Sequence, residues 1–350
     1  MLNKIPGIFI DIDGVLKLGN IPIPKAKEGI ELLRKFKIPF TLVTNDGGDL
    51  EAIKANKYTK ILRLNKEYSF KEDEVVLATT PMISVIKKDI LNNTHNNKVP
   101  FVFGSGNIHR LMKCNGITKY ITDIEYSAIY FHNMGYNTVA HLIPVKEKIK
   151  NEVSKRLNMN LNKQISISSI FQVSDVLRWE LPLQRCCDIL ISKNGLPGTI
   201  RSIDNKYQVP YHLSLDEIDY KDKFILPRYA GGAFFSSVQF LFDKMYKRKI
   251  QYQLYGKPSP KVFDYAINVI NKKVNKIGKS LGNLYMIGDT PQTDIKGANN
   301  YEKDGKGIYS VLVRTGMFKG GINDKKNPAK KVVDNFYEAV MFILNKEKLI

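Results

Sequence analysis

Two aspartates, Asp11 and Asp13, follow a short apolar run near the start of the chain. The run GIFI predicts a buried strand, and Gly14 permits a tight turn directly after the pair. One carboxylate there can attack phosphorus, while the other protonates the leaving alkoxide and later deprotonates water. We therefore expect Asp11 as nucleophile and Asp13 as general acid/base. Taken alone, the pair also fits an Asx-turn or a helix cap.

Three further motifs could complete a phosphoryl-transfer site. In LVTND, Thr44, Asn45 and nearby backbone N–H groups can hold phosphate oxygens. In YGKPSP, the Lys257 ammonium can neutralise the attacking carboxylate and the transferred group. In MIGDTPQTD, Asp289 can bind Mg²⁺, which prefers oxygen ligands, and Asp294 can orient a metal-bound water or pair with the lysine. Each motif alone also fits an ordinary turn or cap, so the prediction depends on all four together.

Short apolar runs alternate with amphipathic stretches, and this alternation places the motifs at strand ends. The strand candidates are GIFID, IPFTLVTN, EVVLAT, VPFVFG, NLYMIGD and YSVLVRT, and helices are expected over residues 25–37 and 50–64. Apolar runs without polar alternation, separated by helices, predict a doubly wound parallel sheet of the α/β class. Sites in such sheets form at the carboxyl ends of the strands, so motifs distant in sequence can meet.

The β/α rhythm weakens in the middle of the chain. At 350 residues and 43% hydrophobic composition, the chain can form more than one core. We therefore expect a discontinuous catalytic core over residues 1–142 and 236–350, with an inserted second domain over residues 143–235.

The four motifs DIDGVL, LVTN, GKP and GDTPQTD resemble the signature motifs of the haloacid dehalogenase superfamily. The wide separation between Thr44 and Lys257 is similar to class IIA, in which a large C2-type cap lies between the second and third motifs. Four segments further resemble the cat eye syndrome critical region group, a set of haloacid dehalogenase-like hydrolase domain-containing proteins. These segments are TNDGGDLE, FQVSDVLRWELPLQRCCDIL, LPRYAGGAF and LYGKPSP.

This resemblance implies a Rossmann-like core, an inserted α/β cap over the site and an aspartyl-phosphate intermediate on Asp11. It implies a small phosphorylated metabolite as substrate and Mg²⁺ as cofactor, held by Asp11, Asp289 and the backbone carbonyl of Asp13. The phosphate-binding residues would be Thr44, Asn45 and Lys257. Asp294 would not bind the metal directly and would support the residues or water that do.

One departure from the family pattern is Asp46, where many class IIA enzymes carry an Asn. A carboxylate there would repel a phosphate dianion unless it turns away. The cap is expected to select the substrate, and Trp179 and Arg228 are the residues that we predict for this role. Arg178 and Arg185 are further candidates, while a packing role for Trp179 is the competing interpretation.

The formal net charge of +20 comes from 54 Lys and Arg against 34 Asp and Glu. The lysines are spread along the chain and arginine is scarce, which favours a solvated surface over specific nucleic-acid binding. A positive field would still attract an anionic substrate. Two alternatives stay open: a non-catalytic phosphate-ligand-binding protein that retains the fold, and a phosphatase acting on nucleic-acid ends.

The sequence also bears on compartment and assembly. Cys114, Cys186 and Cys187 form a poor disulfide framework, because their number is odd and two are adjacent. No apolar run reaches the ~18–20 residues of a membrane span. The first strand begins almost at the first residue, so we expect no signal peptide. We expect an intracellular protein, cytoplasmic or mitochondrial, that could form a homodimer.

Overall fold

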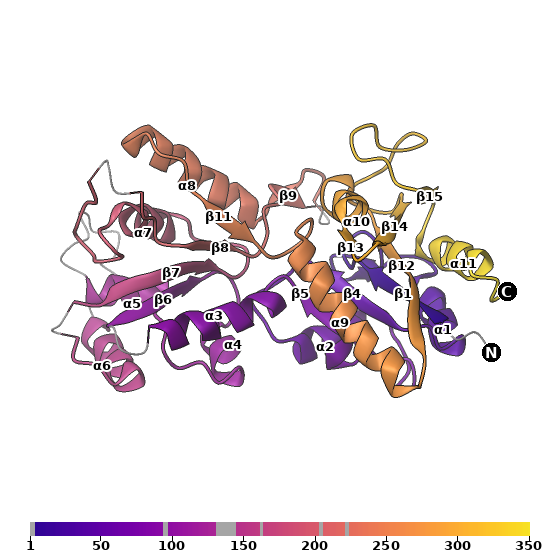
Figure 1. Ribbon diagram of the computed structural model, residues 1–350, viewed down its shortest axis with the longest axis horizontal. Helices are drawn as coiled ribbons and strands as arrows, with labels where there is room; N and C mark the ends of the chain where they lie inside the picture. Colours follow the sequence, from indigo (N-terminus) through magenta and orange to yellow (C-terminus); the bar gives the residue numbers. More distant parts are fainter. Residues whose placement is uncertain (1–3, 94–96, 131–144, 162–163, 203–205, 221–223) are drawn as a thin grey trace.

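The computed structural model describes residues 4–93, 97–130, 145–161, 164–202, 206–220 and 224–350. The chain forms two lobes, each built around its own sheet (Figure 1). Helices alternate with the strands in both, so the predicted α/β class is confirmed. Within the described ranges, no helix has the length and hydropathy that a bilayer crossing requires, and the three cysteines are free.

The core lobe contains a seven-stranded sheet in the described part of the chain. Its central strand β1 (Lys4–Ile10) pairs in parallel with β4 (Phe40–Thr44) on one side and β12 (Ser280–Gly288) on the other. All other pairings are parallel except that of β13 with β14. The remaining strands are β5 (Val75–Leu77), β13 (Glu302–Lys303), β14 (Lys306–Val313) and β15 (Lys331–Val333).

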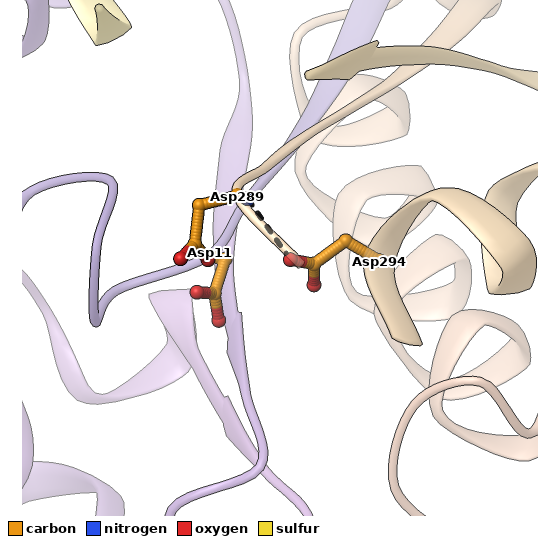
Figure 2. Close-up of side chains that lie close together, drawn as sticks. All are labelled: Asp11, Asp289 and Asp294. Carbon is orange, nitrogen blue, oxygen red and sulfur yellow. Dashed lines mark hydrogen bonds between the residues drawn. The ribbon is translucent and has the colours of Figure 1, made fainter. Parts of the chain in front are cut away.

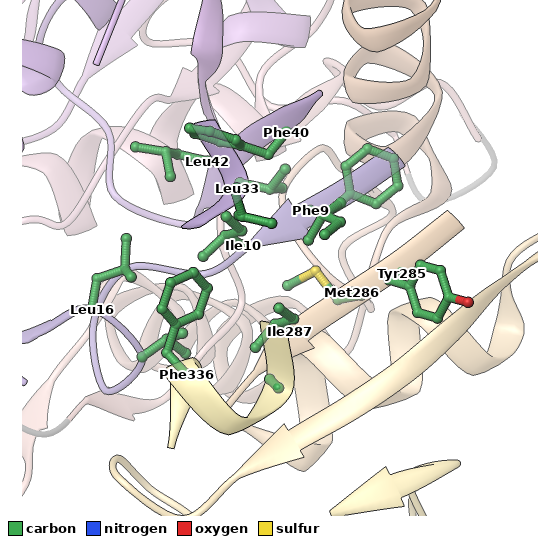
Figure 3. Close-up of a cluster of buried hydrophobic side chains, with 14 of the residues drawn as sticks. Phe9, Ile10, Leu16, Leu33, Phe40, Leu42, Tyr285, Met286, Ile287 and Phe336 are labelled. Carbon is green, nitrogen blue, oxygen red and sulfur yellow. The ribbon is translucent and has the colours of Figure 1, made fainter. Parts of the chain in front are cut away.

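Helices cover both faces of this sheet because strand side chains alternate between them. The ring centroid of Phe9 lies 6.1 Å from that of Phe263 in α9 (Pro260–Lys276), which crosses β1, β4, β5 and β12. Ile10 points the other way, into a cluster with Leu33 and Phe336 (Figure 3). These last two residues belong to α1 (Ala26–Lys35) and α11 (Phe336–Lys346), which pack together.

The cap lobe contains a four-stranded parallel sheet in the order β11-β8-β7-β6. Phe101 and Ile170 face one hydrophobic cluster, and their neighbours Val102 and Phe171 face another, so this sheet is also covered on both sides. The strands are β6 (Lys98–Phe103), β7 (Ser166–Gln172), β8 (Tyr211–Leu213) and β11 (Tyr252–Leu254). The helices are α3 (Thr80–Asn92), α4 (Ile108–Cys114), α5 (Asp123–Ile129), α6 (Lys146–Leu157), α7 (Glu180–Ile191) and α8 (Gly231–Tyr246).

The remaining elements are short. Two short hairpins, one helix and a π-helical turn (Pro291–Ile295) contribute residues to the site, whereas a second helix and a 3₁₀ turn (Glu72–Glu74) do not. The hairpins are β2 (Lys17–Leu18) with β3 (Ile21–Pro22) and β9 (Asp219–Tyr220) with β10 (Arg228–Tyr229). The helices are α2 (Glu51–Ile61) and α10 (Lys296–Asn300).

The second sheet differs from the predicted domain boundaries of 143 and 235. Strand β6, expected in the catalytic core, pairs with β7, and α8, expected to begin the returning core, packs on α7. The segment VPFVFG is buried on both faces like a core strand, so its composition does not reveal which sheet it joins. We propose that the inserted unit extends from α3 to β11.

Candidate active site

The carboxyl ends of three adjacent parallel strands meet at one edge of the core sheet. Thr44 ends β4, Asp11 follows β1, and Asp289 follows β12. Lys257 enters from the loop between β11 and α9. These residues line a cavity of about 500 Å³ that is bounded by both lobes. The structure therefore brings residues of all four motifs together at one cavity, as the sequence predicted.

Lys257 lies at the centre of the site. Its Nζ donates to Asp11 Oδ1 at 2.5 Å and to Asp294 Oδ1 at 2.7 Å, and the side chain is fully buried. Burial alone would lower the pKa of Lys257, but Asp11 and Asp294 outweigh it and hold the pKa above its usual range. The lysine is therefore a fixed positive charge beside the predicted nucleophile.

Asp294 is held from several sides, as Figure 2 shows in part. Its Oδ2 accepts the backbone N–H groups of Asp289 at 3.1 Å and Thr290 at 3.0 Å, while its Oδ1 accepts from Lys257. Asp289 Oδ2 in turn accepts the N–H of Met317 at 2.6 Å. Since both Asp294 oxygens have partners, its geometry suits a supporting role for Lys257 and for the turn after β12.

Three carboxylates could hold a cation among the described residues. Asp11, Asp289 and Asp294 are buried and each offers one oxygen, all within 4.8 Å of one another. Burial, together with the neighbouring Asp294, raises the pKa of Asp289 to about 7. Burial likewise raises the pKa of Asp11 well above its usual value, although Lys257 opposes this. Buried carboxylates short of positive charge fit a hard divalent ion such as Mg²⁺.

Two glycines make room for the Asp289 carboxylate. A Cβ on Gly14 or on Gly316 would collide with it, and Gly14 also has a φ of 85°. Close approach of this kind is available only to glycine. The Gly after the first aspartate pair, read from sequence as a turn residue, therefore also shapes the floor of the candidate metal site.

Asp13 has a partner that the sequence analysis did not identify. Lys17, four residues later in β2, forms an ion pair with the Asp13 carboxylate, and its ammonium lies 5.9 Å from the centre of the Tyr58 ring. Both Asp13 and Lys17 line the cavity. The lysine holds the predicted acid/base at the cavity wall, whereas a metal contact through the Asp13 carbonyl stays a prediction.

Asn45 occupies a different role from the predicted phosphate donor. Its Oδ1 accepts the backbone N–H of Lys257 at 2.8 Å, and its Nδ2 donates to the Lys257 carbonyl at 3.0 Å. The amide therefore clamps the backbone of Lys257 across a large sequence separation. The amide also interacts with the Glu217 carboxyl, and a contact of Asn45 with phosphate stays a prediction.

Asp46, the departure from the family pattern, is neutralised inside the structure. Lys54 of α2 forms an ion pair with its Oδ2, and the Tyr58 hydroxyl donates to the same oxygen at 3.2 Å. Burial is the largest cause that raises the pKa of Tyr58, followed by Asp46 itself. The ion pair with Lys54 thus offsets the repulsion of phosphate that was expected from Asp46.

The cap residues predicted to select the substrate do not line the cavity. The Trp179 Nε1 donates to the Val176 carbonyl at 2.8 Å and its ring packs edge-on against Phe234, as the packing interpretation expected. Arg228 is exposed and its guanidinium lies 4.5 Å from the centre of the Phe224 ring. The substrate roles of Trp179 and Arg228 therefore gain no support from the geometry.

The two other arginine candidates also lie outside the cavity lining. Arg185 is buried in the cap core, where it pairs with Asp188 at 3.3 Å. Arg178 is exposed.

The cap instead contributes other residues to the cavity, chiefly Asp175, Glu217, Asp219 and Tyr220. Burial raises the pKa of Glu217 to about 7, and the charge of Lys257 lowers it only in part. The sequence carries no signal for Glu217, because it sits in an irregular polar segment, SLDEIDY, with no periodicity or motif around it.

The cavity has the opposite charge to the molecule. Among the described residues that line it are eight carboxylates and four lysines, a formal charge of −4, within a chain of formal charge +20. A positive field expected from composition therefore does not extend into the site. Since Lys257 is already counted in this sum, a bound cation would offset part of the remaining negative charge.

Comparison with known proteins agrees with this class of fold and site. Residues 8–118 match the family model of haloacid dehalogenase-like hydrolases, and residues 254–339 match a second model of HAD-hydrolase-like proteins. The two matches contain all four motifs. The chain belongs to the haloacid dehalogenase-like hydrolases.

Two fungal relatives match nearly the whole chain. A cardiolipin synthase (CMP-forming) / mitochondrial hydrolase fusion protein of Schizosaccharomyces pombe is 30% identical over 342 residues, which are 97% of this chain and 53% of that protein. The chain thus spans about half the length of this relative. A mitochondrial hydrolase of Saccharomyces cerevisiae is 26% identical over 360 residues, covering 96% of this chain and 94% of the relative.

Solved structures show the same fold. NagD from Escherichia coli K-12 superposes with a TM-score of 0.57 at 16% identity, covering 96% of this chain and 98% of NagD. A 4-nitrophenylphosphatase from Thermotoga maritima superposes with a TM-score of 0.56 at 17% identity, covering 97% of both chains. Together with the inserted cap lobe, they confirm the predicted class IIA arrangement. The narrower resemblance to the cat eye syndrome critical region group stays a prediction.

Proposed function

We propose that this protein is a Mg²⁺-dependent phosphatase that hydrolyses a small phosphorylated metabolite through an aspartyl-phosphate intermediate on Asp11. The observation that supports it most is the buried Lys257, which binds Asp11 and Asp294 at once beside a cluster of carboxylates. Such a cluster combines a nucleophile, a fixed cation and metal ligands within one cavity. The family and the phosphatases among its structural neighbours support the same reaction class.

In this mechanism an Asp11 carboxylate oxygen attacks phosphorus while the bond from phosphorus to the leaving oxygen breaks. Asp13 gives its proton to the departing alkoxide and then removes a proton from water. The water oxygen attacks phosphorus, the bond to Asp11 breaks, and inorganic phosphate is released. Lys257 stabilises charge on the transferred group, and a bound Mg²⁺ would offset the remaining negative charge of the site.

The test is hydrolysis of p-nitrophenyl phosphate by the wild type and by Asp11→Asn, each with Mg²⁺ and with EDTA. We expect turnover only by the wild type with Mg²⁺, because an amide does not attack phosphorus at a useful rate. Equal turnover by Asp11→Asn would exclude the mechanism. Binding of Mg²⁺ and phosphate without any turnover would favour the non-catalytic alternative.

The other assignments follow from weaker observations. The acidic lining of the cavity argues against nucleic-acid ends as substrates, because a polyanionic strand gains little there. Both curated relatives carry mitochondrial hydrolase in their names, which supports a mitochondrial location for this protein. Cell fractionation tests the location, and light scattering of the purified protein tests the predicted homodimer.

A further inference from the structure

Glu217 lies in the loop between β8 and β9 and lines the cavity together with Asp11 and Lys257. The start of α8 fixes this loop, since the Gly232 N–H donates to the Glu217 carbonyl at 2.9 Å. A side chain at Gly232 would collide with the carbonyls of Asp216 and Glu217. Glu217 is therefore held by a helix end and not by the tip of a hairpin.

The carboxyl of Glu217 faces the catalytic groups of the core lobe. It interacts with the charges of Lys257 and Asp294, with the Thr293 hydroxyl and with the side-chain amide of Asn45. Lys257 already has two carboxylate partners, Asp11 and Asp294. Glu217 is thus a third carboxyl group beside one ammonium, and the lysine does not need it for neutralisation.

A carboxylate in this place works against a bare phosphate dianion. Two like charges a few ångströms apart in a partly buried site weaken binding by roughly tenfold or more. An ionised carboxylate can only accept hydrogen bonds, so a ligand that brings a donor would offset the repulsion. The described cap residues that line the cavity include Asp175 and Asp219 but no cation, so a second anion would find no partner on that wall.

We propose that Glu217 determines specificity by accepting a hydrogen bond from a hydroxyl or ammonium group on the leaving group. This inference rests on the proposed phosphatase function and narrows its substrates to phosphate monoesters of polyols or amino alcohols. Leaving groups with a second carboxylate or phosphate close to the ester are disfavoured. Glu217 thereby takes the role that the sequence had led us to expect of Trp179 and Arg228.

The experiment compares the wild type and Glu217→Gln on four substrates. Glycerol 3-phosphate and phosphoethanolamine carry a donor, p-nitrophenyl phosphate carries none, and phosphoglycolate carries a second anion. The amide keeps the shape but loses the charge and one acceptor oxygen. Glu152→Gln is the matched control, because Glu152 is exposed on α6 of the cap lobe and does not line the cavity. Glu217→Asp, which keeps the charge, serves if the Gln variant does not fold.

We expect Glu217→Gln to lower kcat/KM by about tenfold or more for the two donor-bearing substrates, as the loss of a charged hydrogen bond predicts. The values for p-nitrophenyl phosphate and phosphoglycolate should rise several-fold, because neither leaving group offers a donor and the repulsion by Glu217 is gone. Glu152→Gln should change none of them by more than about threefold. An equal fall for all four substrates, or the same pattern in Glu152→Gln, would overturn the assignment.

Binding of inorganic phosphate, measured by calorimetry with Mg²⁺, gives a readout that does not depend on turnover. Removing the Glu217 charge should tighten phosphate binding several-fold, since the like-charge repulsion is gone. Unchanged or weaker binding in Glu217→Gln would overturn the inference. If the wild type hydrolyses none of the four substrates, the proposed function fails, and the phosphate measurement decides the role of Glu217 separately.

Discussion

The clamp that Asn45 places on Lys257 leads to a prediction that distinguishes two roles for one side chain. In Asn45→Ala the amide that bonds both the N–H and the carbonyl of Lys257 disappears. If the amide is a clamp, Lys257 loses its fixed position and the fold loses stability. If it is only a phosphate donor, phosphate affinity falls and the fold does not change.

The magnitude follows from the two buried hydrogen bonds, at 2.8 Å and 3.0 Å. Each contributes about 0.5–1.5 kcal/mol, so Asn45→Ala should lower the free energy of unfolding by about 1–3 kcal/mol. The upper part of this range is expected, because two polar backbone groups of Lys257 are left without partners. A displacement of the ammonium by about 1 Å would lower kcat by roughly 100-fold.

Urea unfolding and steady-state kinetics with p-nitrophenyl phosphate measure the two effects. Asn56→Ala is the matched control, since Asn56 is exposed on α2 and should change neither quantity. A higher KM for the ester and weaker phosphate binding, with an unchanged free energy of unfolding, would refute the clamp. It would restore the phosphate-binding role read from the sequence.

Three other perturbations test separate parts of the site and fold. Lys54→Met should raise KM for p-nitrophenyl phosphate about tenfold with kcat little changed, because the Asp46 carboxylate then lacks its ion-pair partner beside the site. Adding Asp46→Asn should restore most of the affinity. An unchanged KM in Lys54→Met would contradict a neutralising role for Lys54. Mg²⁺ binding should weaken about tenfold per pH unit below about pH 7, since burial raises the pKa of Asp289 to about 7 and the metal must displace the proton from this carboxyl. Calorimetry below pH 7 measures the Mg²⁺ affinity, and a constant affinity would count against Asp289 as a ligand. Acid should destabilise the cap lobe, because burial lowers the pKa of His212 from 6.5 to about 4 and the unfolded chain therefore binds a proton that the folded chain does not. The free energy of unfolding should fall by about 3 kcal/mol as the pH falls from 6.5 to 4. Urea unfolding across this range measures the fall, and it should be absent in His212→Phe.

The sequence predicted the core lobe well because its strands are buried on both faces. Long apolar runs with helices between them leave few arrangements other than a parallel sheet, and parallel strands bring their carboxyl ends together. The expected helices over 25–37 and 50–64 correspond to α1 and α2, somewhat shortened. The cap boundary stays a prediction, because β6 has the same apolar pattern as a core strand and yet pairs with β7 of the second sheet.

The site was predictable where chemistry depends on a motif and unpredictable where it depends on packing. Asp11, Asp289 and Lys257 each sit in a short segment whose residue types state their chemistry. Glu217 does not, because its position depends on a backbone hydrogen bond to Gly232 and on how the two lobes meet. Arg228 is exposed because it lies in the short β9–β10 hairpin, and no periodic pattern in the sequence predicts that hairpin.

The return from the cap to the core has a consequence for how cap and catalysis can be linked. The N–H of Gly256 donates to the Ser214 carbonyl of the cap at 2.7 Å, and the next residue, Lys257, is clamped by Asn45 of the core. If the cap rotates, this connection would bend within a residue or two of Lys257. Gly256 suits this place, because a Cβ there would collide with the Ser214 carbonyl and the Asn45 amide. The Asn45 clamp would then keep the Lys257 ammonium in place while the cap moves. In Asn45→Ala the position of the ammonium should follow the cap, so kcat should depend on how well a substrate closes the cap.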